Sequence, residues 1–250
     1  MLHVDTQGSG RDIALLHGWG VTARVWSDVA AMLARRYRVH VVDLPGYGKS
    51  ARCAATAAES VDRLAQSLPS RLTVCAWSLG GQLALRWATC TPRQIERLVL
   101  VATTPRFVRS PDWQHGIDEE VFARFMSDVE QDGDSLLDRF AVLQAHGDHH
   151  AQSIVRRLRE CAAVGCSPGT LAGGLALLKQ TDLRADAAQL AQPALLVHGA
   201  NDRVAPPQAG TWLAANMRDA RFIEFANAGH APFLSDPATF VAHVADFFHE

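Results

Sequence analysis

The sequence contains no apolar run that approaches the roughly 18 to 20 residues a membrane-spanning helix requires. Its N-terminal residues, MLHVDTQGSGRD, lack the basic segment followed by an apolar one that marks a secretory signal. Neither sign of charge is in excess, because 24 lysines and arginines face 26 aspartates and glutamates. That balance gives no electrostatic reason for a nucleic acid or an anionic membrane to be the main partner. We therefore expect a soluble cytoplasmic protein that binds neither.

Cysteine is also scarce, with five residues in a chain of 250. The number is odd, and the closest pair, Cys161 and Cys166, has four intervening residues instead of the two of a C-x-x-C motif. We expect reduced thiols, as in a cytosolic protein, and no metal site. The five cysteines are Cys53, Cys75, Cys90, Cys161 and Cys166.

The sequence does contain enough apolar residues for a full core, since 48% of the chain is hydrophobic. A length of 250 residues then implies one large domain or one domain with an insertion. Short apolar runs alternate with longer segments of helical periodicity. This alternation predicts an α/β fold, with a mostly parallel central sheet flanked by helices.

The expected strands are short, apolar and followed by turn residues. They lie at 13–16, 39–42, 72–75, 98–101, 194–197 and 222–225, with 2–6 as a further edge strand. The expected helices lie at 25–35, 56–67, 79–89, 207–215 and 237–248. Strand and helix therefore alternate at both ends of the chain.

Residues 106–182 break this alternation, because they show helical spacing of apolar residues, as at Leu136 and Phe140, and no convincing strand. Connections between strands of such sheets are usually short, and the apolar content of this one argues against disorder. We expect 1–105 and 183–250 to form the core. The segment 106–182 would be a helical insertion that serves as a lid over a site.

The segment 72–84, LTVCAWSLGGQLA, indicates a strand that runs through Ser78 into a helix. Such an elbow strains the backbone of its central residue and needs small neighbours, which Ala76, Gly80 and Gly81 provide. Ala76 stands where the usual G-x-S-x-G pattern has glycine. The alternative is a serine that caps an ordinary helix.

A serine nucleophile needs a base and a carboxylate that orients the base. Asp202 follows the expected strand 194–197, and His230 follows the expected strand 222–225. The order nucleophile, acid, histidine is that of one hydrolase architecture and of neither serine protease order. All three side chains fall at carboxyl ends of strands, where open α/β sheets place their sites. We therefore predict a catalytic triad of Ser78, Asp202 and His230.

Other polar residues compete for these roles. His17 and His198 each precede a glycine directly after a strand, so either could lie near the site. Asp43 ends a strand, but the turn-rich sequence after it fits a structural loop better. Asp236 is best explained as the cap of the last helix.

Acyl transfer also needs N–H donors for the tetrahedral oxyanion. The backbone N–H groups of Trp19 and Leu79 can form that pair, the second aided by the dipole of the helix that it begins. Trp19 lies between two glycines at a strand end, which favours a site wall over a plain core aromatic.

The motifs LLHGWG, DLPGYGKS, AWSLGG, HGANDRV and GHAPFLSDP resemble those of the α/β-hydrolase family across nearly the whole chain. More narrowly, LLHGWGVTARVW, RFAVLQ, GLALLKQTDLR and AGHAPFLSDP are similar to the pimeloyl-acyl carrier protein methyl ester esterases of biotin synthesis. The resemblance runs through the core and the insertion. It implies a serine esterase that acts on the methyl ester of a pimeloyl-acyl carrier protein. We also expect small esters as substrates, a monomer, and no cofactor, since the acyl-enzyme mechanism needs none.

The same resemblance assigns roles to individual residues. Ser78 is the nucleophile, His230 the base and Asp202 the carboxylate that orients it. The ester carbonyl region is contacted by Trp19 and Leu79. An acyl channel is lined by Phe140, Ala141, Val142, Leu143 and Gln144, and the acidic carrier protein is contacted by Arg139, Arg156, Arg157 and Arg159.

The chain departs from the family at Ser135 and Gln152, where further arginines are the pattern, and an arginine run is also typical of a solvated surface. A broad short-chain esterase without a carrier partner therefore stays open as an alternative. So does a hydrolase of lactones or carbon–carbon bonds, and so does a non-catalytic receptor of the same fold.

Overall fold

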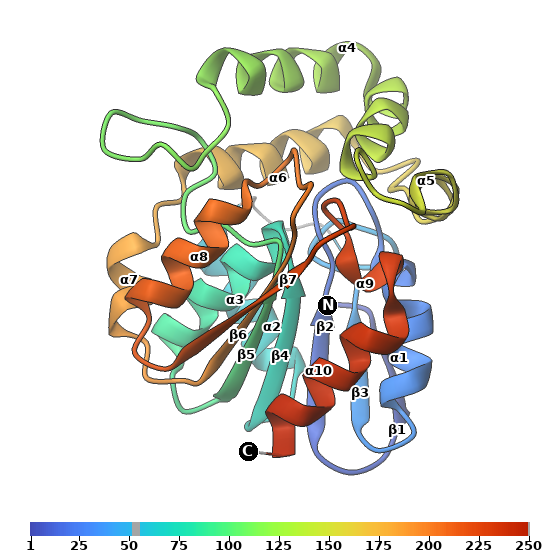
Figure 1. The fold of residues 1–250 in the computed structure, drawn as a ribbon. Helices are drawn as coiled ribbons and strands as arrows, with labels where there is room; N and C mark the ends of the chain where they lie inside the picture. The colour runs from blue at the N-terminus through green and yellow to red at the C-terminus, as the bar shows by residue number, and fades with distance from the viewer. Residues whose placement is uncertain (52–55, 250) are drawn as a thin grey trace.

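The computed structural model describes residues 1–51 and 56–249. Within these residues a central sheet has seven strands in the order β1-β3-β2-β4-β5-β6-β7 (Figure 1). Neighbouring strands are parallel except β1 and β3, which are antiparallel, so the α/β prediction is confirmed. The strands are β1 (Val4–Gly8), β2 (Asp12–Leu16), β3 (Arg38–Val42), β4 (Leu72–Trp77), β5 (Ile95–Val101), β6 (Ala194–Gly199) and β7 (Ala220–Phe225).

Helices connect the strands and cover the sheet (Figure 1). Those of the first half are the 3₁₀ helix η1 (Ala23–Trp26), α1 (Ser27–Leu33), α2 (Ala57–Ser67) and α3 (Leu79–Cys90). Those between β5 and β6 are α4 (Glu119–Gln144), α5 (Ala151–Glu160), α6 (Pro168–Gln180) and α7 (Arg184–Gln189). The last are α8 (Pro207–Asn216), α9 (Pro232–Ser235) and α10 (Pro237–His249).

Both faces of the sheet are buried, because successive strand residues point to opposite sides. In β2, Ile13 and Leu15 belong to the core that includes residues of α1 and α10. Ala14 and Leu16 belong to the other core, which includes residues of α2, α3 and α8. Burial on both faces explains why the strands of the sequence are continuous apolar runs rather than alternating ones.

Several expected elements differ from the structure in their bounds, and two of them differ at both ends. The edge strand β1 lies two residues later than 2–6, since it pairs with β3 from Val4 opposite Val42. Its residues are half-buried or exposed, so an edge strand of this kind produces no apolar run. The expected helix 25–35 begins earlier, as the 3₁₀ helix η1, and α1 ends at Leu33.

The segment between β5 and β6 places α4, α5 and α6 above the carboxyl ends of the strands (Figure 1). Helix α4 is kinked at Asp132, which has φ −156° and ψ 84°. Helix α7 lies beside α3, to which it is joined by an ion pair of 3.8 Å between Asp186 and Arg86. Only α4 to α6 therefore stand over the end of the sheet where a site is expected.

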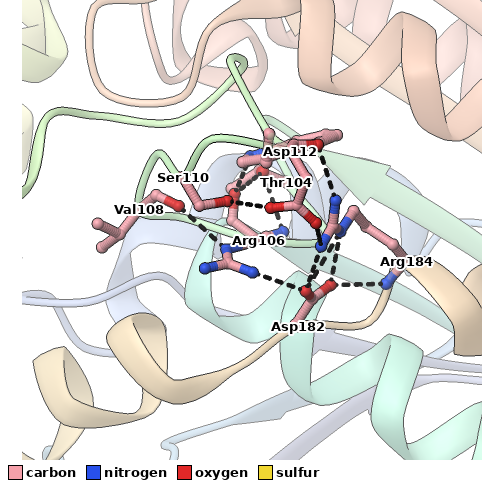
Figure 2. A network of polar contacts seen from close by, with 8 residues as sticks. Thr104, Arg106, Val108, Ser110, Asp112, Asp182 and Arg184 are labelled. Carbon is pink, nitrogen blue, oxygen red and sulfur yellow. Dashed lines mark hydrogen bonds and ion pairs between the residues drawn. The ribbon is translucent and has the colours of Figure 1, made fainter.

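Ion pairs join the two ends of this segment (Figure 2). Arg106 and Asp182 form an isolated β-bridge and an ion pair of 2.9 Å. Arg184 donates to the carboxylates of Asp182 at 2.7 Å and Asp112 at 2.8 Å, and its guanidinium lies over the ring of Trp113. The entry and exit of the segment are thus held together at its base.

Two further expectations concern the cysteines and membrane-spanning helices. In the described part of the chain, Cys75, Cys90 and Cys161 are free thiols, whereas Cys53 lies outside the described residues. Across residues 1–51 and 56–249, the helices are too short or too polar for any of them to span a bilayer.

Candidate active site

Ser78 occupies a strained turn between β4 and α3. Its φ of 55° and ψ of −115° lie where non-glycine residues are rare. The turn is held from both sides, because the Ser78 N–H donates to the Val101 carbonyl at 2.9 Å and the Ser78 carbonyl accepts from Gly81 N–H at 2.9 Å. These two hydrogen bonds therefore hold Ser78 rigidly at the carboxyl end of β4.

Small residues after the serine allow this turn. A Cβ on Gly80 would lie 2.6 Å from the His17 carbonyl oxygen, and a Cβ on Gly81 would collide with the hydroxyl of Thr103. Ala76, two residues before the serine, is fully buried in β4. The elbow thus forms with alanine at the position where the common pattern has glycine.

Asp202 and His230 are joined by a hydrogen bond of 2.8 Å between Oδ2 and Nδ1, and both side chains are buried. The other carboxylate oxygen of Asp202 accepts from the N–H groups of Val204 at 2.8 Å and Ala205 at 2.9 Å. A carboxylate only accepts, so His230 Nδ1 carries the proton and Nε2 is left as the basic nitrogen.

Trp77 links the serine to this pair. Its indole N–H donates to the His230 carbonyl at 2.8 Å, and the two rings lie 5.4 Å apart. Within the described residues the Ser78 hydroxyl makes no hydrogen bond, to His230 or to another group. Such catalytic contacts are often long in a ligand-free enzyme and tighten when substrate binds.

The two predicted oxyanion donors are unused. Leu79 begins α3, and within residues 1–51 and 56–249 neither its N–H nor that of Trp19 donates to another group. A Cβ on Gly18 would lie 3.3 Å from Ser78 Cβ, so the loop that carries Trp19 runs directly beside the serine. Free N–H groups at this place can stabilise a developing negative charge.

The alternative histidines have other environments. His17 donates from Nδ1 to the Gly18 carbonyl at 2.8 Å and accepts at Nε2 from Leu44 N–H at 2.9 Å, so it holds two loops together. His198 Nε2 lies 3.8 Å from Asp202 Oδ2, on a ring whose nitrogens have no hydrogen-bond partner in the described part of the chain. Burial lowers the pKa of each to about 4, so both are neutral near pH 7.

The two alternative acids are structural, as expected. The carboxylate of Asp43 accepts from the N–H groups of Ala23 at 2.9 Å and Lys49 at 3.0 Å, which fixes the turn after β3. Asp236 accepts from Thr239 N–H at 3.0 Å and caps α10.

An apolar cavity opens at Ser78, and most of its wall comes from the segment between β5 and β6. Trp19 forms one side, with its ring against Phe140 and its indole N–H on the Leu171 carbonyl of α6 at 2.8 Å. Trp19 is therefore both a site wall and an anchor for α6. Sequence reasoning missed most of the lining, which adds Phe107, Ile117, Val121, Phe122, Phe125, Leu175, Leu178, Arg203 and Val204.

Only part of the predicted acyl-channel segment reaches this cavity. Phe140 and Leu143 line it, whereas Ala141 packs in the core beside α1 and α10 and Val142 is 50% exposed. Gln144 is buried, and its carbonyl accepts from His230 N–H at 2.8 Å. Consecutive residues of a helix differ by about 100° in direction, so five in a row do not face one cavity.

The predicted carrier-contact arginines lie on the surface of α4 and α5, and most are paired. Arg139 binds Asp128 at 2.6 Å, and Arg159 binds Asp138 at 2.9 Å. Arg157 lies 3.6 Å from Glu160 and donates to the Arg24 carbonyl at 3.2 Å. Among the described residues Arg156 is exposed and makes no ion pair, so its charge is the most available.

Comparisons with known proteins identify the family of the chain. A model of the alpha/beta hydrolase family matches residues 13–243. The chain is 41% identical over 244 residues to a pimeloyl-[acyl-carrier protein] methyl ester esterase of Nitrosomonas europaea, covering 96% of this chain and 97% of that one. It is 40% identical over 246 residues to a protein of the same name from Chromobacterium violaceum, covering 98% and 97%.

Solved structures agree on the fold. An esterase from Exiguobacterium antarcticum superposes with a TM-score of 0.92 at 22% identity, covering 100% of this chain and 96% of that one. An enol-lactonase from Burkholderia xenovorans superposes with a TM-score of 0.87 at 24% identity, with the same coverage. The match of the family model over most of the chain, with relatives that align along nearly its whole length, shows that the chain belongs to the alpha/beta hydrolase family.

Proposed function

We propose that this protein is a serine carboxylesterase that hydrolyses the methyl ester of a pimeloyl-acyl carrier protein to the free acid and methanol in biotin synthesis. The observation that carries the proposal is the extent of the likeness to esterases of that name, 96% of the chain in one case and 98% in another. Such coverage includes the segment between β5 and β6, which builds most of the cavity wall.

In the proposed reaction, Ser78 Oγ attacks the ester carbonyl while His230 Nε2 takes the hydroxyl proton. Asp202 holds the imidazolium, and the N–H groups of Trp19 and Leu79 stabilise the oxyanion. His230 then gives its proton to the leaving methoxide, and methanol departs. A water molecule deprotonated by His230 attacks the acyl-enzyme, and the free carboxylate is released as Ser78 recovers its proton.

The apolar lining of the cavity supports an acyl chain as the bound group. Its wall is aromatic and aliphatic, with Ser78 at one place and Arg203 as its one cation among the described residues. Methylene groups gain free energy in such a site by leaving water. With the methyl ester at Ser78, the chain extends through the cavity and the carrier end faces the surface of α4 and α5.

We propose the remaining features on the same basis. Residues 1–105 and 183–250 form the core, and 106–182 form a lid over the cavity. Arg139, Arg156, Arg157 and Arg159 face the acidic carrier protein. The enzyme works as a monomer in the cytoplasm, without a metal or an organic cofactor.

A broad short-chain carboxylesterase is the second candidate, and one observation favours it. Three of the four carrier-contact arginines, Arg139, Arg157 and Arg159, are paired with acids of their own chain. Ser135 and Gln152 add no charge where further arginines are expected. Recruitment of an acidic partner would then rest on few available cations.

The test compares kcat/KM on pimeloyl-acyl carrier protein methyl ester with kcat/KM on a short p-nitrophenyl ester, with Ser78→Ala as control. The proposal predicts a serine-dependent preference for the carrier-bound ester. Activity on the p-nitrophenyl ester alone would favour the short-chain esterase. Slow turnover with tight retention of ligand would instead indicate a receptor.

A further inference from the structure

Asp148 is a buried carboxylate in the turn between α4 and α5, outside the triad. Its side chain is 1% exposed. Burial of a charged group is costly unless several donors compensate it, so an acid in this place needs an explanation. An apolar side chain of similar size would pack there at less cost if packing were the only requirement.

The donors to Asp148 come from two places. His150 N–H donates to Oδ1 at 2.7 Å, which is an ordinary local turn before α5. Gly229 N–H donates to Oδ2 at 3.0 Å, and the Ser235 hydroxyl donates to Oδ1 at 3.2 Å. These two contacts join the turn to Gly229, directly before His230, and to the end of α9 after it, more than 80 residues along the chain.

Neighbouring contacts fasten the same turn to both triad loops. His230 N–H donates to the Gln144 carbonyl at 2.8 Å, and Asn201 Nδ2 donates to the Gly147 carbonyl at 2.8 Å. Gly229 is packed so closely that an added Cβ would lie 2.6 Å from the Gln144 carbonyl oxygen. The backbone of His230 is therefore fixed by the segment that covers the cavity.

We propose that Asp148 is a positioning residue for His230. By accepting from Gly229 N–H and Ser235 Oγ–H, it fixes the loop so that Nε2 of the imidazole points to Ser78 while Nδ1 stays on Asp202. It also links the position of the segment between β5 and β6 to that of the base. The inference rests on the proposed function, in which His230 is that base.

Three variants of the full-length enzyme test this assignment on a p-nitrophenyl ester. Asp148→Ser keeps a hydroxyl that can accept from His150 N–H, but the serine side chain is too short to accept from Gly229 N–H. Asp148→Asn keeps the shape and one acceptor oxygen for Gly229. Ser235→Ala removes one of the two donors from that part of the chain, so it should cause a smaller loss of the same kind.

We expect Asp148→Ser to lower kcat about 10- to 100-fold with KM within about 3-fold, because a misplaced base slows chemistry without weakening binding. Asp148→Asn should recover kcat to within about 5-fold of the wild type, and Ser235→Ala to within about 3-fold. Circular dichroism and melting temperature establish that each variant is folded at the assay temperature.

Unchanged kcat in Asp148→Ser would overturn the inference, and so would an equal loss in Asp148→Asn or a loss confined to KM. If Asp148→Ser does not fold, Asp148→Val has the shape of the carboxylate without acceptors and carries the same expectation. His230→Ala separates the two hypotheses. Activity in His230→Ala contradicts the proposed function, whereas an inactive His230→Ala beside a fully active Asp148→Ser contradicts only the role of Asp148.

Discussion

At the scale of residues, Ser78 combines backbone strain with a hydroxyl that makes no hydrogen bond within the described residues. Removing that hydroxyl therefore costs the fold little. We predict that Ser78→Ala lowers kcat by about 10³-fold or more on any ester substrate, while the melting temperature stays close to that of the wild type. Initial rates with a p-nitrophenyl ester measure the loss of kcat, and a thermal melt measures the melting temperature. Retention of most of the activity would contradict the role of Ser78.

His198 offers a test of buried charge. Its pKa is lowered to about 4 by burial, so the folded protein resists protonation that the unfolded chain accepts below about pH 6.5. The stability that neutral His198 contributes is therefore complete above pH 6.5 and is lost as the pH falls toward 4. The slope is about 1.4 kcal/mol per pH unit for one proton.

We predict that His198→Leu flattens the decline in the free energy of unfolding between pH 6.5 and 4. Leucine has a similar size and cannot take up the proton. Denaturant titrations at several pH values measure the decline, to which His17 adds a second proton in both proteins. An identical slope in wild type and variant would mean that His198 does not titrate in this way.

In the sequence, a strand end identified each residue of the predicted triad. Ser78, Asp202 and His230 each follow a strand, and the structure joins the last two by a hydrogen bond. The sequence did not distinguish the role of His17 from that of His198. Both precede a glycine directly after a strand, and they differ only in the residues that surround them in the fold. No sequence pattern indicated Asp148, because Gly229 and Ser235, which donate to it, lie more than 80 residues away in the chain.

At the scale of elements, the end of α4 shows what a linear motif leaves undecided. Phe140 and Leu143 face the cavity while Val142, between them, is half-exposed. A motif of consecutive residues identifies the helix but not its face. The face is set by packing on both sides of the kink at Asp132, because Val121, Phe122 and Phe125 of the first part of α4 line the same cavity.

Two substitutions in α4 test this orientation. We predict that Phe140→Ala raises KM for a medium-chain ester about 10-fold, because the acyl chain loses its contact with a large apolar side chain. Val142→Ala, the matched control in the same helix, should leave KM within about 2-fold. Steady-state kinetics on esters of increasing chain length make the comparison. Equal effects of the two substitutions would contradict the observed face.

At the scale of the whole molecule, the alternation of strands and helices was sufficient for the order of the core elements, because parallel strands buried on both faces stand out as apolar runs. It was not sufficient for the bounds of β1, an edge strand of half-buried or exposed residues that lies two residues later than expected. The cavity was beyond prediction for another reason. Its wall joins Trp19 of the core to α4 and α6, and only tertiary packing determines which residues meet.

Recognition of a carrier protein is also a property of the whole surface. We predict that Arg156→Glu raises KM for the carrier-bound ester about 10-fold, and less at high salt, because it reverses an exposed charge on α5. KM for a p-nitrophenyl ester should be unchanged. Arg218→Glu, at an exposed position two residues before β7, is the matched control with the same charge reversal. An equal effect at both positions would indicate net charge rather than a contact surface.

The central claim is that Ser78 removes the methyl group from a carrier-bound pimeloyl ester. The most direct measurement is the intact mass of pimeloyl-acyl carrier protein methyl ester after incubation with catalytic amounts of the wild type and of Ser78→Ala. The account predicts complete conversion to the free acid, with the acyl–carrier linkage intact, by the wild type and none by the variant. A carrier-bound ester left unchanged by a preparation that hydrolyses p-nitrophenyl esters would contradict it.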